Sequence, residues 1–192
     1  MAGATSSVEG VLADFPIPIL PKIVGEPTRE ALIDLHRILI SNAASIVSNL
    51  GGGHHDHLAL TMTADDYLAQ TGHTFVPPHN PGDYPPTLGT AQEQTLGTEI
   101  FRQNQVLFRW YTAVDGALKE HMITAVEPVL LSPIKDQLKR FGQVTALEMT
   151  DHLFRAYGAI DEIDLEENAV KMMGTYNPAE LLARLIEQLE KG

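Results

Sequence analysis

The sequence predicts an all-α fold, a multi-helix bundle made of two small helical parts, and two observations carry this prediction. Apolar residues recur every three or four positions over several long segments, which is the repeat of one helix face. Hydroxyl or amide side chains precede these segments and glycines follow several of them, as at helix ends. With 192 residues, of which 44% are hydrophobic, the chain has enough material to bury a core.

Residues 1–26 are predicted to form an extended, proline-rich arm, because prolines deny a helix in its second half and helical periodicity is short throughout. Residues 27–76 are predicted to form the N-terminal helical part. Its main helix follows the N-cap Thr28, and its apolar face consists of Leu32, Leu35, Leu39, Ala43 and Ile46.

A turn that stops this helix is predicted at three consecutive glycines, since glycine reaches backbone conformations closed to other residues: Gly51, Gly52 and Gly53. After the turn, apolar residues alternate over residues 58–62, and residues 74–76 offer a matching short strand. The sequence therefore allows at most a minor β-hairpin. Between the two, Thr63 is the predicted N-cap of a short helix.

Residues 77–90 are predicted to form a linker loop, because five prolines crowd its first ten positions. Residues 91–192 form the predicted C-terminal helical part. Its clearest local signal is a capping box, in which Thr145 caps a helix and Glu148 returns the hydrogen bond. The helices expected in this part span about 91–126, 132–141, 145–157, 161–173 and 177–192.

The charge and residue content exclude several classes of protein. A formal net charge of −12 gives no general attraction to the phosphates of nucleic acids. The absence of cysteine excludes disulfides, cysteine-type zinc fingers and thiol nucleophiles. No apolar run approaches the length that spans a bilayer, and the first residues lack the pattern of a signal peptide. We therefore expect a soluble, cytoplasmic protein without a membrane partner.

The segment that follows the three glycines is the strongest candidate for chemistry. His54, His55, Asp56 and His57 offer nitrogen and oxygen donors that suit zinc or ferrous iron. A metal-binding enzyme that uses His54, Asp56 and His57 is therefore one reading. A glycine-rich loop is a poor anchor for a preorganised metal site, so the preferred reading is histidines that face solvent, with no metal and no cofactor.

Other catalytic or binding motifs are absent from the sequence. The phosphate-binding frames G-x-x-x-x-G-K-[ST] and G-x-G-x-x-G are missing, and so is a G-x-S-x-G nucleophile elbow. Trp110 lies in the middle of a predicted helix, where a core position is the common outcome. An exposed Trp110 would instead indicate an interface anchor. We therefore expect no catalytic residues.

The order of these segments resembles the Gag-like capsid region of copia-type LTR retrotransposons, in particular a lineage common in algae and other microbial eukaryotes. The resemblance runs from about residue 15 to residue 192. It is carried by N-L-G-G-G-H-H-D-H-L-A-L, by Y-L-A-Q-T-G and by F-V-P-P. It is also carried by T-A-L-E-M-T-D-H-L-F-R-A-Y-G at 145–158, by D-L-E-E-N and by Y-N-P-A-E-L-L. In the 145–158 segment Leu153, Tyr157 and Gly158 match the family pattern, whereas Thr150 stands where the family usually has tryptophan.

The resemblance implies a non-enzymatic structural protein that self-associates into a virus-like particle around the RNA of the element. RNA would then be held by a basic or zinc-knuckle region downstream, so this chain would contact RNA only indirectly. Two alternatives stay open from the sequence. One is the metal-binding enzyme described above, and the other is a helical adaptor that binds a partner protein, for example through the proline-rich loop.

Overall fold

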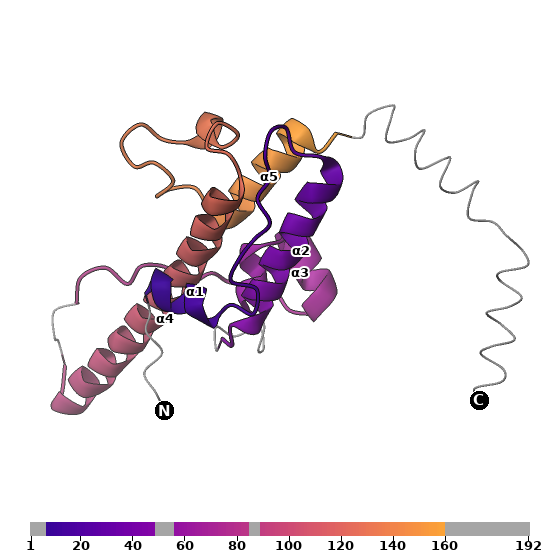
Figure 1. Cartoon of the computed structure of the whole chain (residues 1–192). Helices are drawn as coiled ribbons and strands as arrows, with labels where there is room; N and C mark the ends of the chain where they lie inside the picture. Colours follow the sequence, from indigo (N-terminus) through magenta and orange to yellow (C-terminus); the bar gives the residue numbers. More distant parts are fainter. Residues whose placement is uncertain (1–6, 49–55, 85–88, 160–192) are drawn as a thin grey trace, which may run out of the picture. The chain divides into compact units, whose positions relative to one another are not determined.

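The computed structural model describes residues 7–48, 56–84 and 89–159 and is all-α, as predicted (Figure 1). Within these ranges the only β-type pairings are two isolated bridges, and none of the helices is long and apolar enough to cross a membrane. The helical elements, in chain order, are α1 (Val8–Asp14), α2 (Arg29–Ser45), the 3₁₀ helix η1 (Asp56–Leu60), α3 (Ala64–Thr71), α4 (Ala91–Ala125), the 3₁₀ helix η2 (Ser132–Ile134) and α5 (Ala146–Tyr157).

Helix α4, with 35 residues, is the element against which α1, α2 and α5 pack (Figure 1). Its second half supplies the central row of the core, and α2 also packs directly against α5. Helices from both sides of the proline-rich segment therefore share one core, and the division of the chain into two units falls between Gly158 and Ala159. The largest fully buried apolar side chains are Leu32, Leu39, Tyr67, Leu118, Met122, Leu131, Met149 and Leu153.

Hydroxyl side chains begin all five α-helices of the described residues, because each oxygen accepts a backbone N–H that the first helical turn leaves unpaired. The predicted caps Thr28 and Thr63 are confirmed. The predicted capping box of Thr145 and Glu148 is confirmed as well, and Gly158 ends that helix. A second capping box, formed by Thr90 and Glu93 at the start of α4, was not predicted.

The prediction of an extended arm over residues 1–26 was wrong for Val8–Asp14, which form α1. These residues precede the first proline, and Ser7 caps the helix through a hydrogen bond from the Gly10 amide of 3.1 Å. Val11 is buried at helical spacing from Val8 and Leu12, which also pack on the core. This short amphipathic segment therefore folds as a helix because α4 offers an apolar surface against which it packs.

The sequence allows at most a small hairpin over residues 58–62 and 74–76, and no hairpin forms there, because Asp56–Leu60 form η1 and residues 74–76 carry no strand. Thr61 closes this 3₁₀ turn twice, since both its amide and its hydroxyl donate to the Leu58 carbonyl at 2.9 Å. The alternation of apolar residues instead places Leu60 and Met62 in the interior. Burial of both side chains is compatible with a turn as well as with a strand.

The helix predicted for residues 132–141 was wrong beyond Ile134. The Asp136 carboxylate accepts hydrogen bonds from the amides of Leu138 and Lys139, at 2.8 and 2.6 Å. This local turn competes with the helical hydrogen-bond ladder. Arg140 then takes a positive φ of 54°, and Leu138 is 93% exposed. The helices predicted at 161–173 and 177–192, and the turn at Gly51 to Gly53, lie outside the described residues.

The two glycines of α4 differ in their surroundings, and this difference gives a test of the α1–α4 contact. A Cβ at Gly116 would lie 2.9 Å from Cγ2 of Val8, whereas a Cβ at Gly97 would meet nothing within 4 Å. Gly97→Ala should therefore raise the free energy of unfolding by about 0.5–1 kcal/mol, the usual gain of alanine within a helix. Gly116→Ala should not raise the free energy of unfolding in this way, because α1 has to shift to make room for the new Cβ.

Urea unfolding of the wild type and both variants measures this difference, and Gly97→Ala is the matched control. Equal stabilisation by the two substitutions would show that α1 does not rest on Gly116.

Candidate functional site

The histidine segment is only partly within the described residues. His54 and His55 lie outside them, Asp56 is the first residue of η1, and His57 follows it. His57 is fully buried, which shows that the expectation of a histidine facing solvent was wrong at this position. Its Nδ1 donates to the Ile46 carbonyl at 3.0 Å, and its ring meets Trp110 edge-on with 6.4 Å between centroids. His57 thus joins η1, the end of α2 and the middle of α4.

No group of three or more metal-ligating side chains gathers in the part of the chain that the structure describes. The metal-site reading needs His54 and the Asp56 side chain, so it stays an untested prediction. Trp110, the candidate interface anchor, is half-buried and packs against the core. Trp110 therefore contacts His57 and keeps part of its side chain exposed.

Three further histidines also donate a ring N–H to a backbone carbonyl of a distant segment. His36 Nε2 bonds to Thr61 O at 2.6 Å, His121 Nε2 to Pro18 O at 2.9 Å, and His152 Nε2 to Leu130 O at 2.9 Å. Because a carbonyl oxygen only accepts, the ring nitrogen that faces it has to carry the proton. Like His57, these side chains link separate segments of the fold. Sequence reasoning missed them, since nothing local identifies partners that are 22 to 103 residues away.

Asn42 forms the centre of a buried polar network that holds the arm on the core. Its Oδ1 accepts the Ile17 amide at 3.1 Å, and its Nδ2 donates to the Ile17 carbonyl at 3.0 Å. The same Nδ2 donates to His121 Nδ1 at 3.3 Å, and the opposite edge of that ring donates to Pro18 O. Along the network each donor faces an acceptor. This pattern favours the neutral tautomer of His121 that carries its proton on Nε2.

Asp115 and Lys119 join α4 to the start of α5. Their ion pair measures 2.8 Å, and the two side chains are only 13% and 15% exposed. Asp115 Oδ1 also accepts the Ala146 amide at 2.9 Å, and Lys119 Nζ donates to Val144 O at 2.9 Å. The carboxylate therefore stabilises the N-terminus of α5, where backbone N–H groups are unpaired.

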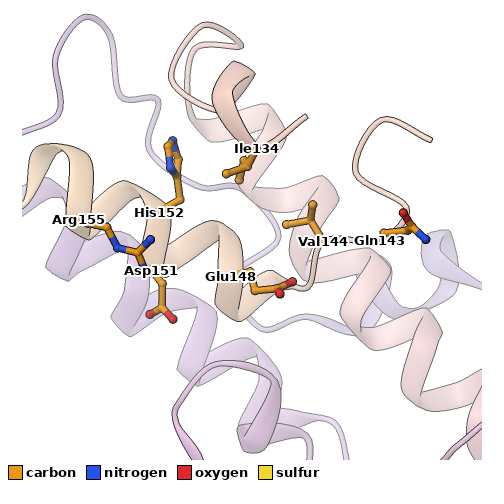
Figure 2. Close-up of a pocket in the computed structure, with 7 residues that line it drawn as sticks. All are labelled: Ile134, Gln143, Val144, Glu148, Asp151, His152 and Arg155. Atoms are coloured by element: carbon orange, nitrogen blue, oxygen red, sulfur yellow. The ribbon is translucent and has the colours of Figure 1, made fainter. Parts of the chain in front are cut away.

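A hollow with several polar side chains lies between α5 and the segment that precedes it (Figure 2). It has a volume of about 430 Å³, and its lining is Ile134, Gln143, Val144, Glu148, Asp151, His152 and Arg155. Glu148 belongs to the capping box of α5, and His152 donates to the Leu130 carbonyl. An acid and an imidazole one helical turn apart would suit proton transfer. Here both are engaged in contacts that hold the fold, so we assign the hollow no chemistry.

Tyr111 lies on α4, where burial and, secondarily, the nearby Asp115 carboxylate raise the pKa of its phenol to about 12. A raised pKa means that the folded state favours the neutral phenol. The stabilisation is complete below about pH 10, where tyrosine of the unfolded chain begins to ionise, and it is lost as the pH rises through 12. Because the side chain is partly exposed, we expect this loss to be about 1–2 kcal/mol.

Urea unfolding of wild type and Tyr111→Phe between about pH 9 and pH 12 tests this prediction. The variant should lose less stability than wild type over this range, because it has no phenol at position 111 to ionise. An equal loss of stability with rising pH in Tyr111→Phe and in wild type would contradict the prediction.

An apolar row on the first half of α4 is the clearest candidate for a binding surface. Counting back from the core in steps of three or four residues, the face that carries Val114 and Trp110 continues through four further positions. We call these four positions the α4 stripe: Leu96, Ile100, Gln103 and Leu107. Val114 is 0% exposed, whereas Ile100 is 48% and Leu96 62% exposed. Ile100 is therefore on the same row as Val114 but outside the core.

No family model, curated protein or solved structure matches this chain.

Proposed function

We propose that the chain is a structural protein of the Gag or capsid type, from a copia-like retrotransposon, that self-associates into a virus-like particle. The observation that carries this proposal is the α4 stripe, an apolar helix face that runs out of the core and ends in solvent among the described residues. Exposed apolar surface of this kind is typical of sites where proteins associate. An assembly protein needs such surfaces and needs no active site.

The segment 145–158, which carries much of the family resemblance, is consistent with this proposal. Thr150 occupies the position where the family usually has tryptophan, and its side chain is only 4% exposed. Its hydroxyl donates to Ala146 O at 3.0 Å and lies 3.7 Å from Met122 Sδ of α4. The position is thus a core position against α4, as a tryptophan there would be. Leu153 is buried on the same face.

With a net charge of −12, this protein would have no general attraction to RNA, and its copies would repel one another. RNA would be held by a separate basic region in the same polyprotein or particle, and this chain would form the shell. Repulsion between acidic copies falls when salt screens their charges. Assembly should therefore be favoured by high protein concentration and high ionic strength.

Sedimentation velocity and negative-stain electron microscopy of the purified chain, over a range of protein and salt concentrations, test the proposal. We expect larger species, and particles at high salt. A chain that stays monomeric throughout would overturn the proposal that this segment assembles by itself.

A further inference from the structure

We infer that the α4 stripe of one copy pairs antiparallel with the α4 stripe of a second copy, about a two-fold axis between Ile100 and Gln103. This inference rests on the proposed function and names one of its contact surfaces. It commits to a second copy of this chain as the partner, and the partner surface is the same four side chains.

The α4 stripe continues a row of side chains that belongs to the core. Along α4, one row of side chains runs through Leu96, Ile100, Gln103, Leu107, Trp110, Val114, Leu118, His121 and Ala125. The last four are buried, Trp110 and Leu107 are half-buried, and Ile100 and Leu96 are exposed. The helix thus presents a core-type surface beyond the point where α1, α2 and α5 end their contacts. Such a surface is stabilised when another apolar helix face covers it.

Other aromatic side chains of the same chain pack on α4 near the stripe. Tyr84 meets Phe101 edge-on at 5.1 Å between centroids, and Phe75 meets Tyr111 at 5.9 Å. Phe75 and Tyr84 therefore pack on α4 without covering the stripe, since Leu96 and Ile100 keep their exposure. Among the described residues, nothing covers Leu96 and Ile100 of the stripe, although aromatic side chains pack on α4 nearby.

The spacing of the α4 stripe makes it self-complementary. Its steps of four, three and four residues read the same in both directions. When two such helices lie antiparallel, Leu96 faces Leu107 of the other copy and Ile100 faces Gln103, and the same pairs repeat across the axis. An interface with two-fold symmetry requires this property, because each contact has to occur twice.

The charge around the α4 stripe differs from that of the whole chain. The whole chain carries −12, so most pairs of surfaces repel each other. Residues 91–110, in contrast, hold two acidic and two basic side chains and no net charge: Glu93, Glu99, Arg102 and Arg109. Glu99 and Arg102 already pair within the helix at 3.0 Å. Contact along this half of α4 therefore adds less local repulsion between two copies than contact through the acidic rest of the chain would.

The contact is short, so it should be weak. From Leu96 to Leu107 the helix rises about 16 Å, and each copy contributes four side chains to the contact. A standard protein interface uses about 20–30 residues on each side. A pair of isolated copies should form only at high concentration. In a particle, the same weak contact gains strength because each copy is held by several neighbours at once.

Disulfide trapping tests the register, and the chain suits it because it contains no cysteine. Equal amounts of Leu96→Cys and Leu107→Cys protein are mixed, oxidised and digested, and the linked peptides are identified by mass spectrometry. Antiparallel pairing predicts that the 96–107 disulfide dominates. Predominant 96–96 and 107–107 disulfides would indicate parallel pairing and overturn the inference. So would a lack of trapping under conditions where wild type associates.

Leu96→Glu, measured by sedimentation, tests whether the stripe drives association. Because the residue occurs twice in a symmetric contact, we expect self-association to weaken more than tenfold. Leu138→Glu is the matched control, since it makes the same change at an apolar side chain that is 93% exposed elsewhere on the surface. It should leave association nearly unchanged.

The outcomes separate this inference from the proposed function. If both variants assemble like wild type, the stripe is not the contact, while the proposed function stands. If wild type itself stays monomeric, both fail. If Leu96→Glu lowers the unfolding temperature of the monomer, another part of the same chain covers the stripe, and the inference of a second copy is overturned.

Discussion

Asn42→Ala is expected to lower the free energy of unfolding by about 3 kcal/mol. The substitution removes the side chain that pairs with both the amide and the carbonyl of Ile17, and it also removes the donor to His121 Nδ1. Asn42 is fully buried, so these partners would lose their hydrogen bonds in an environment with little water. A buried polar group left without a partner costs about 1–3 kcal/mol, and here several are affected together.

Urea unfolding followed by circular dichroism measures this loss. Asn104→Ala, at an exposed position of α4, is the matched control and should change stability by less than about 0.5 kcal/mol. If Asn42→Ala were no more destabilising than the control, the network would not hold the arm. Hydrogen exchange offers a second measurement, since the Ile17 amide should exchange faster in the variant.

His57→Ala is expected to lower the free energy of unfolding by about 2–4 kcal/mol. The ring is fully buried between the end of α2 and Trp110, so truncation leaves a cavity. It also leaves the Ile46 carbonyl without its donor at 3.0 Å. His57→Phe keeps most of the ring volume and loses the hydrogen bond, so its loss of stability should be smaller, about 1–2 kcal/mol.

His73→Ala is the control for His57, because His73 is exposed. We expect it to change stability by less than about 0.5 kcal/mol. The same series distinguishes a structural histidine from a metal ligand when it is repeated with zinc. If zinc stabilised wild type strongly and His57→Ala abolished that effect, the metal-site reading would replace the structural one.

The parts of the fold that could be predicted from the sequence are those determined by neighbouring residues. Thr28, Thr63 and Thr145 begin helices where the sequence places them, because a hydroxyl cap and the N–H that it accepts lie within three residues. The apolar row of α2 is buried for a similar reason, since its period is that of a helix.

The parts that could not be predicted depend on distant partners or on competing local bonds. Residues 132–141 have an apolar period, but hydrogen bonds to the Asp136 carboxylate turn the chain before a second helical turn can form. α1 forms because α4 covers its apolar side, which the seven residues alone do not reveal. His57 was placed in solvent because it follows a glycine-rich loop, whereas its burial depends on Ile46 and Trp110.

The attachment of the arm has a consequence for how the chain folds. The bonds from the Ile23 amide to the Ala125 carbonyl and from His121 to the Pro18 carbonyl join residues that are about a hundred positions apart, 103 in the second case. During synthesis, residues 15–23 therefore leave the ribosome well before the end of α4 exists. Contacts of high sequence separation also form slowly, because a long loop has to close first. Phe15 and Leu20 would stay exposed during this interval, so newly made chains should be most prone to aggregation before α4 is complete.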